Sequence, residues 1–332
     1  MPLLAGNDDA VLDAAAQHLA DGALVAFPTE TVYGLGARAD DAEAVAAIFA
    51  AKGRPADHPL IVHVVGIEQA ACFAAELPPV ARRLMQAFWP GPVTVIVPRA
   101  AGVASAAAGG QASIGLRCPA HPVAQALLRR AAALGVPGVA APSANRFGRV
   151  SPTSAAHVAD EFGDALWLLD GGDCPLGIES SIVDCSRGAA VLLRPGVLSR
   201  DQLEAALGQT LRSADELAPR APGTLASHYA PRARLRLLPA AALEVALEAA
   251  LHPAAMLPAR LAVYSQRAGS AMSGLRWHRM PDDPACLAHE LFAVIRQLDG
   301  EGATDIWVEQ PPEDAAWEGV LDRLRRAATA EP

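Results

Sequence analysis

The sequence has no run of about 18 uninterrupted apolar residues, the length typical of a membrane-spanning helix, so we predict no membrane segment. Its first residues include no basic group and turn acidic at Asp8, so we expect no signal peptide. The five cysteines are odd in number, lie far apart and form no CxxC pair, which disfavours a disulfide framework and a zinc site. These absences favour a cytoplasmic protein with free thiols and no metal held by the protein.

Aromatic residues and basic charge are also in short supply. Aromatics make up 5% of the residues, and the formal net charge is −9. An acidic chain repels a nucleic-acid backbone unless its basic residues gather in one place, so a dedicated DNA or RNA coat protein is disfavoured. With 52% hydrophobic and 19% charged residues, the chain is nevertheless expected to fold around a packed core.

The common motifs GxxxxGKS/T, GxGxxG, HExxH and GxSxG are absent. Lysine and asparagine are almost absent too, since Lys52 is the only lysine and Asn145 is one of two asparagines. Where a rare residue type stands inside a motif of a chain this rich in arginine, its own chemistry is a reason for its presence. A nucleotide site, if the chain has one, must be built without the common phosphate loops.

The order of predicted elements divides the chain into two α/β regions. In residues 1–208, helices and strands are interleaved, and the strands crowd toward the end. Residues 209–232 are rich in proline, glycine and small polar residues, which is typical of a linker or a covering loop. In residues 233–332, strand and helix candidates alternate, which predicts a small parallel sheet.

Individual elements can be predicted around the motifs. We expect a helix that begins after Asp40 or Asp41 and ends near Lys52, with Gly53 as the residue that terminates it. A loop over 28–36 is expected to follow the short strand 23–27. Further strands are expected at 59–65, 93–97, 112–117, 138–142, 165–169, 181–185 and 190–194.

The segment from Ala51 to His63 is the strongest local signal. Lys52 at a helix C-terminus favours the helix dipole, but Arg would do so equally well. The compact charge of a lysine suits a polyphosphate, so Lys52 and Arg54 predict an anion site. His63 lies on the following strand, where a satisfied core histidine is the simpler interpretation.

Three other segments carry groups suited to ligand binding. The loop after residue 27 carries Thr31, the loop after residue 141 carries Ser143, Asn145 and Ser151, and Ser180 opens a strand near Arg194. Each is also compatible with an ordinary turn or helix entry. Four basic residues at element ends (Lys52, Arg54, Arg117 and Arg194) would nevertheless form a cationic cavity that suits a triphosphate or a carboxylate.

Taken in order, these segments resemble the YrdC-like L-threonylcarbamoyladenylate synthases in their two-domain form. The resemblance rests on FPTETVYGLG, KGRPADHPLIVH, WPGPVTVIV, SIGLRCP, APSANRFGRVSPT, GIESSIVD and LLRPG, and on the linker APGTLASHYAP. It implies a twisted open α/β sheet around a large concave pocket and a small Rossmann-like parallel C-terminal domain. It places the synthase domain in 1–208, a linker or lid in 209–232 and the C-terminal domain in 233–332.

The resemblance also implies an activity. Members of this family join L-threonine, bicarbonate or CO2, and ATP into threonylcarbamoyl-AMP and pyrophosphate. Mg²⁺ is expected with ATP, and the product is expected to pass to tRNA-modifying transferase proteins, with tRNA itself not bound tightly.

Carried over position by position, the resemblance implies two groups of site residues. The threonine pocket comprises Thr31, His63, Arg117, Ala141 and Ser180, and the ATP contacts comprise Lys52, Arg54, His58, Ser113, Ser143, Asn145, Ser151, Arg194 and Tyr229. Lys52 and Arg54 would be the catalytic residues, and Tyr229 would cover the nucleotide. Two places depart from the family pattern: His58 replaces a usual asparagine, and the linker residues 224–228 are less basic.

Two alternatives remain open at this point. One is a non-catalytic RNA-binding or regulatory module, against which the net charge and the scarcity of aromatics count. The other keeps the fold and makes a related carbamoyl-adenylate from another substrate.

Overall fold

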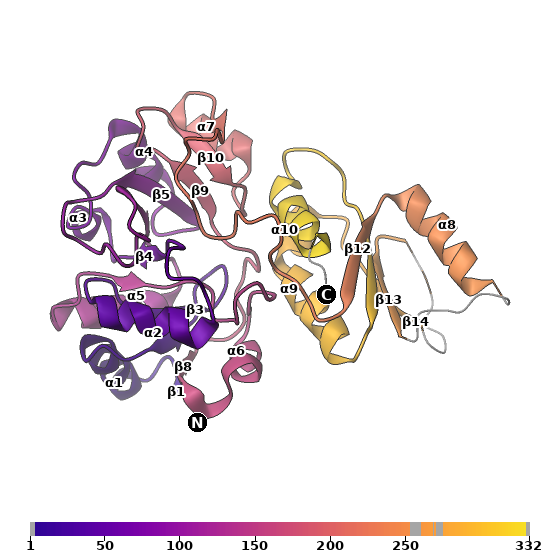
Figure 1. Ribbon diagram of the computed structural model, residues 1–332, viewed down its shortest axis with the longest axis horizontal. Coiled ribbons are helices and arrows are strands. Elements are labelled where there is room, and N and C mark those ends of the chain that lie inside the picture. The colour runs from indigo at the N-terminus through magenta and orange to yellow at the C-terminus, as the bar shows by residue number, and fades with distance from the viewer. Residues whose placement is uncertain (1–3, 253–259, 268, 270–274, 330–332) are drawn as a thin grey trace. The chain divides into compact units, whose positions relative to one another are not determined.

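The structure is a computed structural model that describes residues 4–252, 260–267, 269 and 275–329. It separates into two compact units (Figure 1). The N-terminal unit comprises Met1–Phe147 and Ser151–Thr224, and the C-terminal unit comprises Gly148–Val150 and Leu225–Pro332. The expected linker, 209–232, therefore spans the boundary between Thr224 and Leu225.

A single large mixed sheet organises the N-terminal unit. In the described part of the chain it has 11 strands in the order β1-β8-β2-β3-β7-β4-β6-β5-β9-β10-β11. The strands are β1 Leu4–Ala5, β2 Val25–Phe27, β3 Gly34–Arg38, β4 Ile61–His63, β5 Val93–Pro98, β6 Ser113–Arg117, β7 Val139–Ala140, β8 Trp167–Asp170, β9 Ser181–Asp184, β10 Val191–Arg194 and β11 Arg212–Ser213. The helices are α1 Asp9–Ala20, α2 Ala42–Lys52, α3 Ile67–Ala70, α4 Pro79–Phe88, α5 Pro122–Ala133, α6 Ala155–Phe162 with the 3-10 turn Gly163–Ala165, and α7 Arg200–Leu207.

Helix α2 begins and ends where its sequence predicts. The Asp41 side chain accepts hydrogen bonds from the backbone N–H groups of Glu43 (2.8 Å) and Ala44 (3.2 Å), which caps the helix. Gly53 follows in the left-handed conformation, with φ of 63°, and terminates it. These two ends fix the position of Lys52 in the last turn.

Strand β3 is a correction to the sequence prediction, which places residues 28–36 in a loop. Gly34 and Gly36 disfavour a strand by propensity, but this strand requires them. A Cβ atom on Gly36 would lie 2.7 Å from Phe27 Cε1 and 2.8 Å from Val139 Cγ1. Only glycine therefore lets β3 pass between β2 and β7.

The pleat of the central strands separates core residues from polar ones. His63 of β4 pairs in register with Arg117 of β6, so their side chains share one face of the sheet. Ile96 of β5 pairs with Gly115, which lies two residues before Arg117 in β6. Thr94 lies two residues before Ile96, so its side chain is on the same face as Arg117. The other face buries Val62, Val95 and Leu116 in the main hydrophobic core. The sheet is thus anchored on one face and carries polar side chains on the other.

The C-terminal unit is a four-stranded parallel sheet in the order β12-β15-β13-β14, as the residues described show. Its strands are β12 Arg234–Leu238, β13 Leu261–Ser265, β14 Leu275–Arg279 and β15 Asp305–Glu309, and its helices are α8 Ala240–Leu251, α9 Pro284–Gly300 and α10 Glu318–Ala328. The predicted α/β architecture is confirmed in both units. The sequence did not indicate β14, because this edge strand (LRWHR) has too few apolar residues to stand out.

No helix among the described residues is long and apolar enough to cross a membrane.

Candidate functional site

Arg117 and Glu30 form a buried ion pair in the N-terminal unit. Arg117 closes β6, and Glu30 lies in the loop between β2 and β3. Arg117 Nη2 lies 2.7 Å from Glu30 Oε1, and the side chains are only 4% and 7% exposed. The other carboxylate oxygen, Oε2, accepts a hydrogen bond of 3.0 Å from the backbone N–H of Ala120. The loop and the end of β6 are thereby held together.

Several polar atoms of this region are buried without a hydrogen bond. Arg117 Nε and Nη2, Glu30 Oε1 and His63 Nδ1 have no hydrogen-bond partner among the residues that the structure describes. The contact between Arg117 and Glu30 is thus a charge contact whose angles fall outside those of a hydrogen bond. Because nearly all buried polar groups in native proteins are paired, such a cluster indicates a place that a ligand completes.

His63 is buried and uncharged. Burial, and secondarily the positive charge of Arg117, lower the pKa of His63 from 6.5 to about 3. Its ring meets that of Phe27 edge-on, with 6.2 Å between the ring centres. His63 is thus a buried core residue with backbone hydrogen bonds at Ile61 and Val139 that partly oppose the fall in its pKa, while its Nδ1 has no hydrogen bond.

We expect acid to destabilise the fold through His63. Because its pKa is lower in the folded chain than in the unfolded one, unfolding takes up a proton between about pH 3 and 6.5. We expect the free energy of unfolding to fall with decreasing pH below 6.5, by at most about 1.4 kcal/mol per pH unit from this group. Urea denaturation of the wild type and His63→Asn from pH 7 to pH 4 measures it. Equal slopes for the two proteins would contradict this assignment.

Thr31 is held by a turn of hydroxyl hydrogen bonds. The Thr29 hydroxyl donates to Val32 O at 2.6 Å, so Thr31 Oγ1, 2.9 Å away, is the donor in the contact between the two threonines. The Thr31 hydroxyl oxygen can therefore still accept a hydrogen bond, and Thr31 directly follows Glu30 in the chain.

Ala141, which follows β7, donates its N–H to Ile61 O at 2.9 Å, and this hydrogen bond fixes its backbone beside β4.

Lys52 joins α2 to the loop after β7. Its Nζ donates to Ser143 O at 2.6 Å and also to Asn145 O. Burial, and then the neighbouring charge of Arg54, lower the pKa of Lys52 well below its ordinary value. The only lysine of the chain thus binds the backbone of the loop after β7, which is predicted to contact ATP. An anion would stabilise the charged form of Lys52 more than these two neutral carbonyl groups do.

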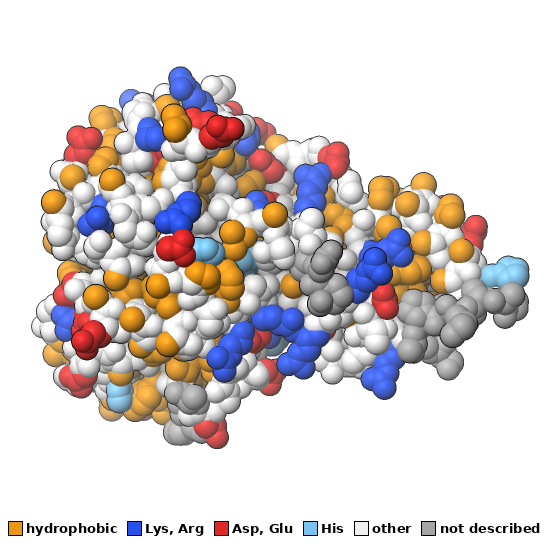
Figure 2. Space-filling model, viewed as in Figure 1, with side chains coloured by type: hydrophobic (Ala, Val, Ile, Leu, Met, Phe, Trp, Pro, Cys, Tyr) orange, Lys and Arg blue, Asp and Glu red, His pale blue; other side chains and the backbone are white. Residues whose placement is uncertain are grey.

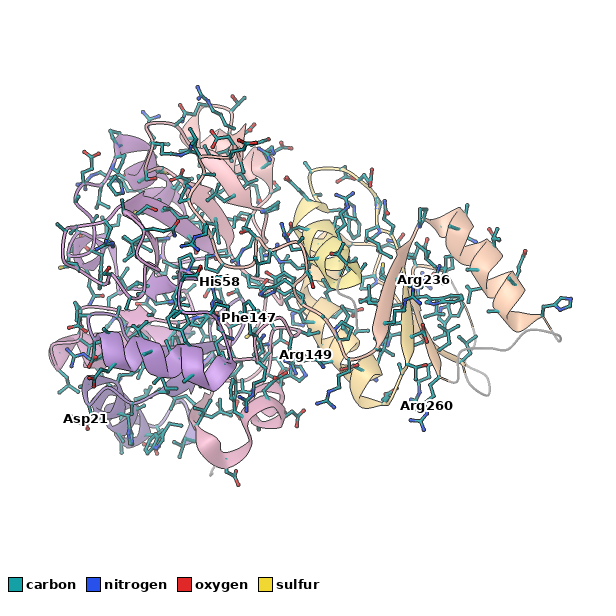
Figure 3. The ribbon with its side chains drawn as sticks, in the orientation of Figure 1. Asp21, His58, Phe147, Arg149, Arg236 and Arg260 are labelled. Atoms are coloured by element: carbon teal, nitrogen blue, oxygen red, sulfur yellow. The ribbon has the colours of Figure 1, made fainter. Side chains whose placement is uncertain are left out.

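The ring of Phe147 has His58 beside it (Figure 3) and Arg54 within cation–π distance. Arg54 Cζ is 5.8 Å from the ring centre, and the His58 ring centre is 5.4 Å from it. Arg54 Nη2 also donates to Pro59 O at 2.9 Å. Burial, and then the charge of Arg54, lower the pKa of His58, so this side chain favours its neutral form.

Ser180 and Arg194 meet at the start of β9 and the end of β10. Arg194 Nη2 donates to Ser180 O (2.9 Å) and Oγ (3.3 Å), and Ser180 Oγ lies 2.8 Å from Thr94 Oγ1. Arg194 Nη1 donates to Pro222 O at 2.9 Å. The segment around residue 222 is therefore fixed over the polar face of the sheet.

A small pocket, partly open to solvent, lies on this face. Ser113, Gly115 and Thr94 line it from the sheet, and Arg220 and Pro222 line it from the segment above. The Arg220 guanidinium pairs with Asp57 at 2.7 Å, and its backbone makes hydrogen bonds with the side-chain amide of Gln111.

Elsewhere in the unit, Ser151 Oγ donates to Glu179 Oε1 at 2.5 Å, and both side chains are buried.

Tyr229 differs from the other predicted site residues because it belongs to the C-terminal unit. Its ring is buried, stacks on Phe292 of α9 at 5.4 Å and lies 5.5 Å from Arg323 Cζ of α10. The next residue, Ala230, donates its N–H to Gly148 O at 2.8 Å, and Gly148 is grouped with the same unit. A contact of Tyr229 with nucleotide stays a prediction.

Sequence reasoning missed three residues of this region: Glu30, Thr94 and Phe147. Thr94 alternates with buried valines in β5, a signal that could have been read as a polar group on one face. Phe147 stands in a loop of small and basic residues, where a large aromatic side chain is unusual. The described residues contain no group of three or more His, Cys, Asp or Glu that could hold a metal, and all five cysteines are free.

Two family models match the chain. The Sua5/YciO/YrdC model, described as "Telomere recombination", matches residues 17–196. The model described as "Threonylcarbamoyl-AMP synthase, C-terminal domain" matches residues 198–329.

Individual proteins match over 70% to 97% of the chain. A threonylcarbamoyl-AMP synthase of Pyrococcus abyssi is 37% identical over 326 residues, which are 95% of this chain and 93% of the relative. The Bacillus subtilis protein of that name is 42% identical over 70% of this chain and 68% of its own. The crystal structure of P. abyssi Sua5 complexed with L-threonine has a TM-score of 0.86 at 35% identity and covers 97% of this chain and 95% of that one.

Proposed function

The chain belongs to the Sua5/YciO/YrdC family, and we propose that it is a threonylcarbamoyl-AMP synthase. It joins L-threonine, bicarbonate or CO2, and ATP into threonylcarbamoyl-AMP and pyrophosphate. The observation that carries this proposal is the buried cluster of Arg117, His63 and Glu30, whose unpaired donors and acceptors suit an amino acid. The structure of the P. abyssi relative with L-threonine supports the same substrate class.

In the proposed threonine pocket, Arg117 binds the substrate carboxylate. Neither Nε nor Nη2 of its guanidinium makes a hydrogen bond, although Nη2 lies 2.7 Å from Glu30 Oε1, and these two nitrogens form the edge that a bidentate carboxylate requires. Neutral His63 lies beside it on β4 and adds no competing charge. Thr31, Ala141 and Ser180 supply a hydroxyl, backbone and a second hydroxyl to complete the pocket.

In the proposed ATP site, Lys52 and Arg54 bind phosphate oxygens, and Arg194 adds a third positive charge. Lys52 exchanges its contacts with two backbone carbonyls for an anion, which is favourable in a buried position. The remaining proposed ATP contacts are His58, Ser113, Ser143, Asn145, Ser151 and Tyr229.

The chemistry needs alignment and charge neutralisation rather than a protein nucleophile. The threonine amine adds CO2 with loss of a proton and becomes a carbamate. A carbamate oxygen then bonds to the α-phosphorus of ATP, the bond to the bridging oxygen breaks, and pyrophosphate leaves. Lys52 and Arg54 offset the negative charge that grows on the phosphate oxygens, and the buried setting strengthens each contact.

Mg²⁺ is expected to accompany ATP, but the described residues do not fit a metal site built by the protein. They contain no cluster of three acidic, histidine or cysteine ligands. We therefore assign the ion to the phosphates and derive no step through it.

The product, a mixed anhydride, is proposed to pass to transferase proteins that modify the adenosine beside the anticodon of tRNA. The alternative of an RNA-binding module is less well supported. The chain carries a net charge of −9, and basic and acidic side chains are interspersed on the face of the N-terminal unit drawn in Figure 2.

Pyrophosphate release tests the proposed function. We expect release from ATP to require L-threonine and bicarbonate together, and to stop when either is omitted. Serine in place of threonine tests the alternative of a related carbamoyl-adenylate. Release that does not depend on threonine would reject the substrate, and a folded protein that binds ATP but releases no pyrophosphate would reject the activity.

A further inference from the structure

Glu30 is fixed by two hydrogen bonds from backbone N–H groups, and one of its carboxylate oxygens accepts no hydrogen bond. Its backbone oxygen accepts the N–H of Leu176 at 2.9 Å, and Oε2 accepts the N–H of Ala120 at 3.0 Å. Its Oε1 is buried, faces Arg117 at 2.7 Å and has no hydrogen bond from any described residue. The carboxylate is therefore oriented through Oε2, while Oε1 faces the Arg117 charge and accepts no hydrogen bond.

The arrangement differs from that of a purely structural ion pair. A buried pair offsets the cost of removing two charges from water only when its geometry is good and its remaining lone pairs and protons are satisfied. Arginine and carboxylate usually achieve this through parallel hydrogen bonds. Here Arg117 Nε and Nη2 and Glu30 Oε1 all lack hydrogen bonds, so charge is balanced while hydrogen-bonding capacity is left over.

The leftover capacity matches an α-amino acid in its zwitterionic form. The carboxylate of such a ligand accepts hydrogen bonds and its ammonium group donates them, and both are attached to one carbon atom. Arg117 offers donors, and Glu30 offers an acceptor, Oε1, that lies 2.7 Å from Arg117 Nη2. With Arg117 alone, the ammonium group would be buried without a counter-charge, which is costly. With both residues, the site and its ligand are each neutral overall.

Building on the proposed function, we propose that Glu30 is a substrate-binding residue whose Oε1 accepts a hydrogen bond from the α-ammonium group of threonine while Arg117 binds the carboxylate. The pair is then a receptor for the zwitterion, and it selects α-amino acids over hydroxy acids of the same shape. The nearby hydroxyl of Thr31 belongs to the same loop, so one loop contributes two contacts.

The test compares two ligands on the Glu30→Gln variant. One is L-threonine, and the other is 3-hydroxybutanoate, which is threonine without its amino group. Calorimetric titration should show threonine affinity reduced about ten-fold or more, as for the loss of a hydrogen bond to a charged group. The affinity for 3-hydroxybutanoate should be unchanged or higher, because a negative charge near its carboxylate has been removed.

Asp184→Asn is the matched control. Asp184 is another buried carboxylate of this unit, paired with Arg187 at 3.0 Å, and its replacement should leave the affinities for both ligands unchanged. If Glu30→Gln does not fold, Glu30→Asp takes its place, since the shorter side chain withdraws the charge from the ammonium group and should give the same threonine-selective loss.

The outcomes separate this inference from the proposed function. Equal losses for the two ligands in the Glu30 variant would show that Glu30 only maintains Arg117, and unchanged threonine binding would remove any role; either result overturns the inference. Failure of the wild type to bind threonine or release pyrophosphate would instead overturn the proposed function.

Discussion

Replacing Lys52 by methionine is expected to lower threonine-dependent pyrophosphate release by about 100- to 1,000-fold, the effect of losing one preorganised charge contact in a buried site. Methionine keeps the length and the apolar stem of the buried side chain but cannot donate to phosphate. The loss corresponds to about 2.7–4 kcal/mol of transition-state stabilisation. It should appear mainly in kcat, because the negative charge on the phosphate oxygens grows in the transition state.

Two other variants make this expectation specific. Arg38→Met removes a cation of the same unit that is paired with Asp40 outside the site, and it should retain activity. Lys52→Arg keeps the charge but replaces a compact ammonium group with a planar fork, so it should recover only part of the activity. A folded Lys52→Met protein with activity close to that of the wild type would contradict a phosphate role for Lys52.

Replacing Arg117 by lysine is expected to raise the KM for threonine about 10- to 100-fold and to leave the KM for ATP nearly unchanged. Lysine keeps a positive charge beside Glu30 but cannot bind a carboxylate through two nitrogens in one plane. The loss of a hydrogen bond to a charged group accounts for about 1.5–3 kcal/mol.

Arg117→Met supplies the control for stability in this series. It leaves Glu30 as a buried charge without a partner and should cost about 3–5 kcal/mol of unfolding free energy, much more than Arg117→Lys. Steady-state kinetics with each substrate varied in turn, together with urea denaturation, measures both effects. Equal rises in the two KM values of Arg117→Lys would argue against a dedicated carboxylate contact.

Elements whose signals are local could be predicted from the sequence. Helix α2 follows from Asp41 as its cap and Gly53 as its end, both of which act on neighbouring backbone groups. The alternation of strands and helices after residue 233 predicted the parallel sheet of the C-terminal unit. The order of the large sheet could not be predicted in this way, because it depends on pairings between strands far apart in the chain, such as β5 with β9.

The residues of the candidate site also divide into those with a local signal in the sequence and those whose role depends on distant contacts. Lys52 stood out because it is the only lysine, and Arg117 because it closes a strand. Glu30 gave no signal, since an acidic residue between two threonines is typical of a solvated turn. Its burial depends on Arg117 and on Ala120, which is 90 residues further along the chain. Residues whose role comes from a distant partner are therefore the ones that the sequence does not reveal.

The most direct measurement is the identification of the nucleotide product made from ATP, L-threonine and ¹³C-labelled bicarbonate. Mass spectrometry should find an AMP conjugate that contains threonine and one labelled carbon. Fragmentation should place that carbon between the threonine nitrogen and the phosphate. A conjugate of threonine and AMP without the label would show that the enzyme activates the amino-acid carboxylate directly, and it would contradict a threonylcarbamoyl-AMP synthase.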